Sequence, residues 1–205
     1  ASSIRGMFLP LLQYHPRQGL DFIIDLLNHA GTWYGEQRWP CGRLEPAQQI
    51  SIGVPGEFQV TQWANQRLWG LYRGHEVGPY VLQTALMALE AWLLGLCGSE
   101  GVDLVFLLLK ILRESNNVMA TAVVASVCNA HPEKAGRAGL ALLSSRELIR
   151  MDQERTVKER THSPVSRSFP RLGLDQIYED ERKKSDGLPH RGHDLEALAV
   201  KMQFT

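Results

Sequence analysis

The sequence lacks both an excess of charge of one sign and a set of closely spaced cysteines. Lysine plus arginine and aspartate plus glutamate number 22 each, so the formal net charge at pH 7 is zero. This balance argues against a dedicated nucleic-acid-binding protein, which usually has a basic surface, although it leaves room for a local patch. The cysteines, Cys41, Cys97 and Cys128, are scattered and odd in number. We therefore expect neither a disulfide framework nor a zinc site, and a reducing, cytoplasmic location.

Long hydrophobic runs and targeting signals are also missing. The longest apolar run, around residues 105–109, is bounded by Asp103 and Lys110, and it is much shorter than the about 20 residues that cross a bilayer. The first residues lack a basic stretch followed by a continuous apolar one, so we predict no signal peptide and no membrane partner. The chain begins with Ala1 and not with methionine, which favours a piece of a longer polypeptide.

No catalytic or cofactor-binding motif is found. The phosphate-binding loop Gly-x-x-x-x-Gly-Lys-Ser/Thr and the nucleophile motif Gly-x-Ser-x-Gly do not occur. Ser126 and Cys128 lie in an apolar stretch, where a hydroxyl bonded to the helix backbone and a small buried thiol are expected. We therefore predict no catalytic residue and no cofactor.

Apolar side chains recur at helical spacing through most of the chain. Residues 20–30 predict an amphipathic helix that Gly31 should end, with an aromatic loop following to residue 44. Further helices are predicted over residues 79–96, 103–112, 118–129, 132–143 and about 145–160. Their short connections are typical of antiparallel neighbours, so the fold class is mostly α: an antiparallel helical bundle or a short, HEAT-like α-solenoid.

One small β-hairpin is predicted within residues 49–61. Ile50, Ile52 and Val54 alternate with other residues, Pro55-Gly56 can form a turn, and the alternation resumes at Phe58. An isolated hairpin is marginally stable, so we expect it as an insertion on the helical body.

The composition changes in the last third of the chain. Residues 161–173 are polar, contain two prolines and predict a linker or mobile loop. Residues 174–205 predict a C-terminal helical appendage, with a short charged helix over 174–184 and a last helix over 195–204 that Asp194 caps. Residues 1–160 then form one helical scaffold domain that includes the hairpin.

Aromatic and basic residues are concentrated between the hairpin and the helix at residue 79. They are Trp63, Arg67, Trp69, Tyr72 and Arg73. These side chains could stack on bases or hold a partner peptide, which makes them the predicted interaction site. Alternatively, the aromatic rings belong to the core and the arginines bind carboxylates such as Glu76 or Glu90.

A second cluster lies near the C-terminus, at His190, His193 and Asp194. Two imidazoles and a carboxylate can bind a divalent metal, but a hydrolytic site would need further ligands from other helices. The cluster is the candidate metal site, and a metal-dependent hydrolase is one alternative function. Asp194 as a helix N-cap explains the same residue without a metal.

Three blocks of sequence carry a resemblance to a known kind of protein. Residues 65–94 (NQRLWGLYRGHEVGPYVLQTALMALEAWLL), 114–136 (ESNNVMATAVVASVCNAHPEKAG) and 178–196 (YEDERKKSDGLPHRGHDLE) are similar to a helical region of large, multidomain bacterial P-loop ATPases of the STAND-like kind associated with anti-phage defence. The resemblance implies a non-catalytic scaffold or sensor module whose partners are another protein or other domains of the same polypeptide. The ATPase motifs of that family are absent, so no catalytic residue is carried over. A nucleic-acid-contacting helical domain is the remaining alternative.

Overall fold

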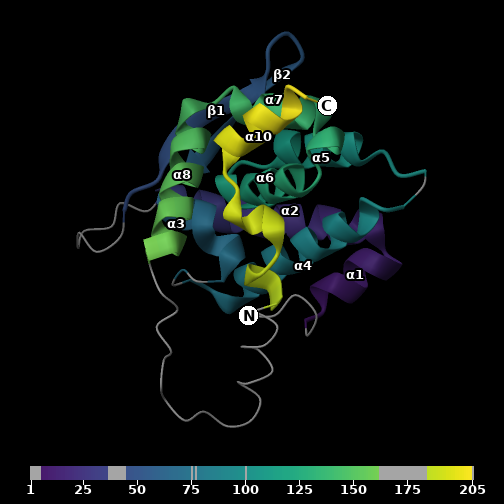
Figure 1. Cartoon of the computed structure of the whole chain (residues 1–205). Coiled ribbons are helices and arrows are strands. Elements are labelled where there is room, and N and C mark those ends of the chain that lie inside the picture. Colours follow the sequence, from purple (N-terminus) through teal and green to yellow (C-terminus); the bar gives the residue numbers. More distant parts are fainter. Residues whose placement is uncertain are drawn as a thin grey trace.

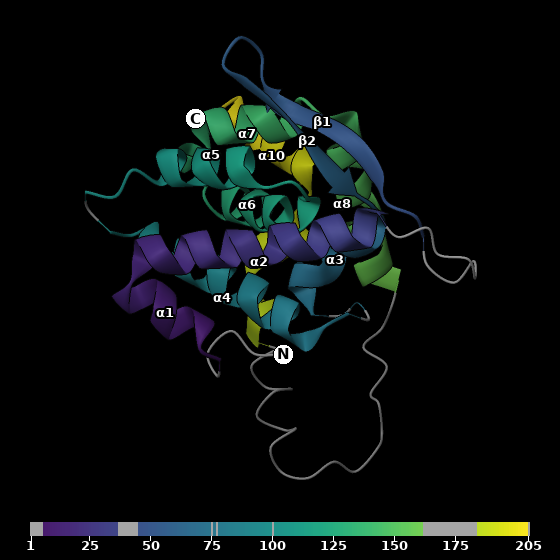
Figure 2. The same ribbon diagram turned by 180° about the vertical axis from the view of Figure 1, so that it is seen from behind.

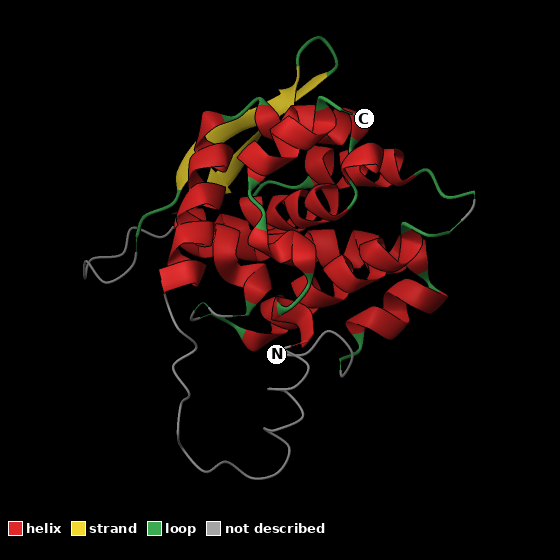
Figure 3. Ribbon diagram, viewed as in Figure 1, coloured by secondary structure: helices red, strands yellow, loops and turns green. Residues whose placement is uncertain are grey.

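The computed structural model describes residues 6–36, 45–74, 76, 78–99, 101–161 and 184–204. These residues form a mostly helical body with one two-stranded antiparallel sheet at its edge (Figure 3), which confirms the predicted fold class. The longer helices are α1 (Phe8–Tyr14), α2 (Pro16–Glu36), α4 (Tyr80–Leu96), α5 (Leu104–Glu114), α6 (Val118–Ala130), α7 (Gly136–Leu143), α8 (Arg146–Thr161) and α10 (Leu195–Met202). Short helical segments are α3 (Gln66–Gly70), η1 (Leu71–Arg73), η2 (Pro132–Lys134) and η3 (Pro189–Gly192). The sequence had not predicted α1.

Helix α6 lies at the centre of the body. Every residue from Val118 to Asn129 is buried, because the helix is built from small and apolar side chains that let neighbours approach closely. It packs against α2 and α4 on one side and against η3 and α10 on the other (Figures 1 and 2). In a solenoid each repeat contacts only the adjacent ones. A helix that contacts elements from both ends of the chain therefore fits the bundle alternative better than the solenoid.

Helix α2 is longer than predicted, because Gly31 does not end it. A β-carbon on Gly31 would lie 2.7 Å from Cβ of Asn117, and one on Gly35 would lie 2.2 Å from the ring of Trp63. Asn117 and Trp63 therefore pack directly against the backbone of α2 at these two glycines. Close packing, and not helix termination, explains Gly31, and the helix includes the first residues of the predicted aromatic loop.

The hairpin consists of β1 (Gln48–Val54) and β2 (Phe58–Ala64), paired from Gln48 opposite Ala64 to Val54 opposite Phe58. The turn uses Gly56 at a positive φ of 79°, a conformation that glycine adopts without strain. Gln62 anchors the hairpin to the body: its amide donates to the carbonyl oxygens of Leu112 and Ser115 at 3.2 and 3.0 Å. The predicted hairpin is confirmed, and β2 extends to Ala64.

The C-terminal segment packs onto this body. Leu195 and Leu198 of α10 are fully buried in the same hydrophobic core as α6, and Asp194 caps α10 by accepting from the backbone N–H of Ala197 at 3.0 Å. The described part of the predicted appendage therefore shares the core of the helical domain. The predicted linker and charged helix lie outside the described residues, except at Thr161 and Lys184. No helix in the described ranges is long and apolar enough to cross a membrane.

Candidate functional site

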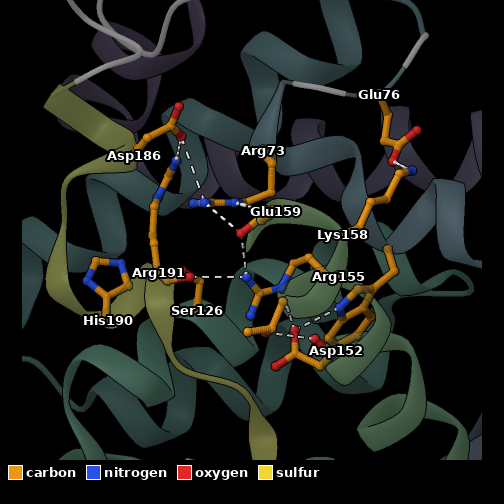
Figure 4. Close-up of polar contacts among 12 residues, drawn as sticks. Arg73, Glu76, Ser126, Asp152, Arg155, Lys158, Glu159, Asp186, His190 and Arg191 are labelled. Atoms are coloured by element: carbon orange, nitrogen blue, oxygen red, sulfur yellow. Dashed lines mark hydrogen bonds and ion pairs between the residues drawn. The ribbon is translucent and has the colours of Figure 1, made fainter. Parts of the chain in front are cut away.

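A chain of buried charges joins the C-terminal segment to the helical body (Figure 4). At one end Arg191 of η3 donates from Nη2 to Glu90 of α4, and the hydroxyl of Ser126 on α6 donates to the other carboxylate oxygen at 2.5 Å. Arg191 also reaches Asp186, with 3.4 Å between Nη1 and Oδ1. Glu90 is the only charged residue of α4, and it is almost fully buried.

The chain continues through α8. The guanidinium of Arg73 lies 3.8 Å from Asp186 and binds both carboxylate oxygens of Glu159 at 2.7 and 3.0 Å. Figure 4 shows Arg73 and Arg155 on either side of Glu159, and Arg155 donates to Glu159 at 2.9 Å and to Asp152 at 2.7 Å. We call the residues of this chain the buried ion-pair network: Asp186, Arg191, Glu90, Arg73, Glu159, Arg155 and Asp152.

The network also binds backbone and aromatic groups. Arg155 donates to the carbonyl oxygens of Arg191 and His193 at 3.1 and 2.7 Å, and the indole N–H of Trp69 donates to Asp152 at 3.0 Å. A single arginine on α8 therefore binds the C-terminal end of η3 through two carbonyl oxygens. Glu90, Arg155 and Arg191 are at most 4% exposed, so the loss of a partner would leave a charge in a low-dielectric interior. These contacts hold residues 186–193 against the body.

The electrostatics of the network stabilise its charged forms. Burial by itself raises the pKa of Glu90, but His190, Arg191 and Ser126 around the carboxylate bring the pKa below its usual value. Burial opposes the charge of Arg155, yet Tyr72 and Asp152 beside it raise its pKa above the usual range. The charged forms of Glu90 and Arg155 are therefore favoured, and each faces a side chain of opposite sign.

The five predicted interaction residues do not form one exposed surface. Trp69, Tyr72 and Arg73 are buried at 0%, 3% and 5% exposure, while Trp63 packs against the core and Arg67 is half-buried. Trp69 and Arg73 belong to the network and its surroundings, as the structural alternative predicted, although the carboxylate that Arg73 binds is Glu159. The signal that could have identified the network was Glu90, an isolated acid in an apolar helix.

The predicted metal ligands are brought near one another but are engaged elsewhere. The Nδ1 atom of His193 lies 2.9 Å from Nζ of Lys201, and the carboxylate of Asp194 caps α10. His190 faces Glu90, with 3.8 Å between Nε2 and the carboxylate. Among the residues that the structure describes, no group of three or more His, Cys, Asp or Glu side chains is arranged to hold a metal ion.

A depression of about 390 Å³ lies beside these residues, between α6, η3 and α10. The polar residues that line it are Asn129, His131, His190, His193 and Lys201, and the apolar ones are Leu94, Ala130, Leu188 and Pro189. Two buried atoms here have no hydrogen-bond partner: Oδ1 of Asn129 and Nε2 of His190. Partial burial, together with the charge of Lys201, lowers the pKa of His193. The depression thus has a lysine and a histidine in its lining, while the unpartnered oxygen of Asn129 is enclosed.

Comparison with known proteins does not extend this description, because the sequence matches no model of a protein family and no curated protein. The resemblance of residues 65–94, 114–136 and 178–196 to STAND-like ATPases stays a prediction. The function is therefore inferred from the geometry of the ion-pair network and of its surroundings.

Proposed function

We propose that this chain is a non-catalytic helical scaffold and sensor module that contacts a partner protein or other domains of a longer bacterial, STAND-like ATPase polypeptide. The observation that carries the proposal is the buried ion-pair network. It ties residues 186–193 to α4, α8 and the segment around Arg73, and so connects the C-terminal segment to helices at the centre of the chain.

The network suits a structural role better than a catalytic one. Its carboxylates bind arginines, and its arginines bind carboxylates and backbone carbonyl oxygens, so these groups are engaged with one another. Buried ion pairs contribute little net stability compared with apolar packing, but they can specify one arrangement over others. Here the arrangement they specify is the position of the C-terminal segment on α6 and α8.

Exposed aromatic side chains on α2 provide a surface for the partner. Phe22 and Trp33 are 46% and 54% exposed, and they lie on the same side of the helix because about three turns of about 3.6 residues separate them. Figure 2 shows α2 as an outer helix along one whole side of the body. Aromatic residues are enriched in the centres of protein interfaces. This surface takes the place of the segment around Trp63, whose aromatic side chains face inward.

Site-specific photo-crosslinking in the native host tests the proposal. Benzoylphenylalanine at position 22 or 33 should give a crosslinked product of one defined mass, or a crosslink to another part of a longer polypeptide. Position 150 is the control, because Arg150 is 68% exposed and belongs to a different helix, α8. Crosslinks of the same pattern from positions 22, 33 and 150, or from none of them, would contradict the proposed surface.

A further inference from the structure

The outward face of α2 carries acidic side chains beside its exposed rings. We propose that this face binds a basic segment of the partner, whose arginine or lysine side chains pair with Asp25 and Glu36 and lie against the rings of Phe22 and Trp33. This partner chemistry rests on the surface proposed above, and it specifies what that surface recognises.

Six exposed residues of α2 form one stripe along the helix. They are Gln18, Phe22, Asp25, His29, Trp33 and Glu36. Successive members are three or four residues apart, a spacing that places side chains on one side of an α-helix. The buried residues Leu20, Ile24 and Leu27 lie on the opposite side. Figure 2 shows α2 crossing the front of the body, with no other described element over it. We call these six residues the α2 stripe.

The α2 stripe contains two carboxylates and neither lysine nor arginine. Asp25 and Glu36 are both exposed, and neither forms an ion pair with any residue that the structure describes. Arg17 is the only lysine or arginine of α2, and it lies in the first turn, outside the stripe. The stripe therefore has a negative charge that a basic partner would balance.

The charged residues beside the stripe do not offset this charge. Asp21 lies one turn before Asp25, and its carboxylate binds Lys110 of α5 at 2.8 Å. The same ammonium group binds Glu114 at 2.5 Å, so two carboxylates share one cation and one negative charge remains. The chain as a whole is neutral, which makes the negative charge on this side of the molecule a local feature.

Each exposed ring of the stripe has a carboxylate on the next turn. Asp25 follows Phe22 by three residues, and Glu36 follows Trp33 by three residues. A guanidinium group can bind a carboxylate and also lie over a neighbouring ring. The two ring–carboxylate pairs are 11 residues apart, or about 16 Å along the helix axis. A partner contacts both pairs if its cations are about 11 residues apart in a helix, or about five in an extended strand.

The stripe also has an anchored aromatic contact. The ring of Phe22 stacks on that of the buried Phe8, with 6.4 Å between centroids and 21° between planes, so part of the contact surface is already in position before a partner binds. The sign of the charge favours a basic protein segment over nucleic acid or an anionic membrane, both of which a negative surface repels.

Photo-crosslinking from position 29 tests the chemistry of the partner. His29 is exposed in the middle of the stripe, and its replacement leaves both rings and both carboxylates in place. Benzoylphenylalanine at this position, in the native host, should give a crosslinked peptide that mass spectrometry identifies as rich in arginine and lysine. Asp25→Lys with Glu36→Lys should lower the yield about tenfold or more, because like charges across an interface are strongly unfavourable. Asp25→Asn with Glu36→Gln should lower it less.

A matched control reverses two charges on another helix. Glu147 and Glu154 are exposed on α8, so Glu147→Lys with Glu154→Lys changes the net charge of the chain by the same amount. It should change the crosslinking yield less than about twofold, because distant exposed charges are screened by salt. Thermal melts followed by circular dichroism check that every variant is folded.

Several results would overturn this inference. They are an equal loss of yield in the two lysine double variants, a captured peptide that is neutral or acidic, and a crosslink to a second copy of the chain. A crosslink to residues 37–44, which contain Arg38 and Arg43 and lie outside the described ranges, would also contradict it. If positions 22 and 33 still crosslink when both acids are lysine, the proposed surface stands and the basic partner is wrong. If positions 22, 29 and 33 of the unmodified chain give no crosslink, both proposals are wrong.

Discussion

Glu90 and Arg191 are 101 residues apart in the sequence and form an ion pair in which both side chains are at most 3% exposed. No local sequence pattern predicts that these two residues are in contact. The pair forms because η3 packs against the centre of the helical body. Through this pair and Arg155, the C-terminal segment becomes part of the same folded unit as α4 and α6.

Removing one member of the pair should be costly. Arg191→Met leaves the Glu90 carboxylate buried without its main partner, and we expect a loss of about 3–5 kcal/mol in the free energy of unfolding. The double variant Glu90→Leu with Arg191→Met should recover most of that loss, because both charges are then absent. Urea unfolding followed by circular dichroism measures both.

A control comes from an exposed pair on α8. Arg150 and Glu154 are 3.4 Å apart and more than half exposed, so Arg150→Met should change stability by less than about 1 kcal/mol. If Arg191→Met is no more destabilising than Arg150→Met, the buried pair does not hold the C-terminal segment.

The stability of the fold should fall in acid because of Glu90. Its pKa is lower in the folded protein than in a free chain, so at acid pH the unfolded state binds more protons at this site. The contribution is present above the pKa of the unfolded carboxyl, about 4.3, and is lost as the pH falls through the folded value. Urea unfolding at a series of pH values should show this dependence in the unmodified chain and a smaller one in Glu90→Gln. Identical pH profiles would exclude Glu90 as the source.

His193 should titrate below the usual range of histidine, for reasons that two variants can separate. Burial and the charge of Lys201 lower its pKa, whereas Asp194 raises it. Lys201→Met should therefore raise the pKa of His193, and Asp194→Asn should lower it further. The imidazole C–H signals in an NMR titration report both shifts, and shifts of the same sign in the two variants would contradict the geometry described for this site.

Cys128 should be inert towards thiol reagents in the folded protein. Burial in α6 raises the pKa of its thiol to about 12, so at pH 8 only about one thiol in 10,000 is ionised and able to react. Alkylation with iodoacetamide, followed by peptide mapping, should modify Cys128 only as fast as the chain unfolds. Adding urea below the midpoint should increase the rate, and rapid labelling in the absence of denaturant would show that α6 is accessible.

The sequence predicted the elements that have a local signal. Asp194 was identified as the cap of α10, and Pro55-Gly56 as the turn of the hairpin. These features depend on residues within a few positions of one another. What the sequence could not predict depends on distant contacts: the carboxylate that Arg73 binds lies 86 residues away, and the depression is formed by three separate segments.

The role of Gly31 also depends on a distant contact that the sequence does not reveal. Substitution by alanine can test this contact. A glycine after an amphipathic stretch is typical of a helix end, but here α2 continues and the missing side chain makes room for Asn117, whose Cβ would lie 2.7 Å from an added methyl group. Gly31→Ala should therefore destabilise the fold by about 1–3 kcal/mol, the usual range for overpacking.

Gly95 of α4 is the matched control, because a β-carbon there meets no atom within 4 Å. Gly95→Ala should stabilise the protein by up to about 1 kcal/mol, since alanine has the higher helix propensity. Urea unfolding measures the change in the free energy of unfolding for each variant. Changes of opposite sign would show that α2 packs closely against the α5–α6 connection at Gly31. Stabilisation by both substitutions would contradict this contact.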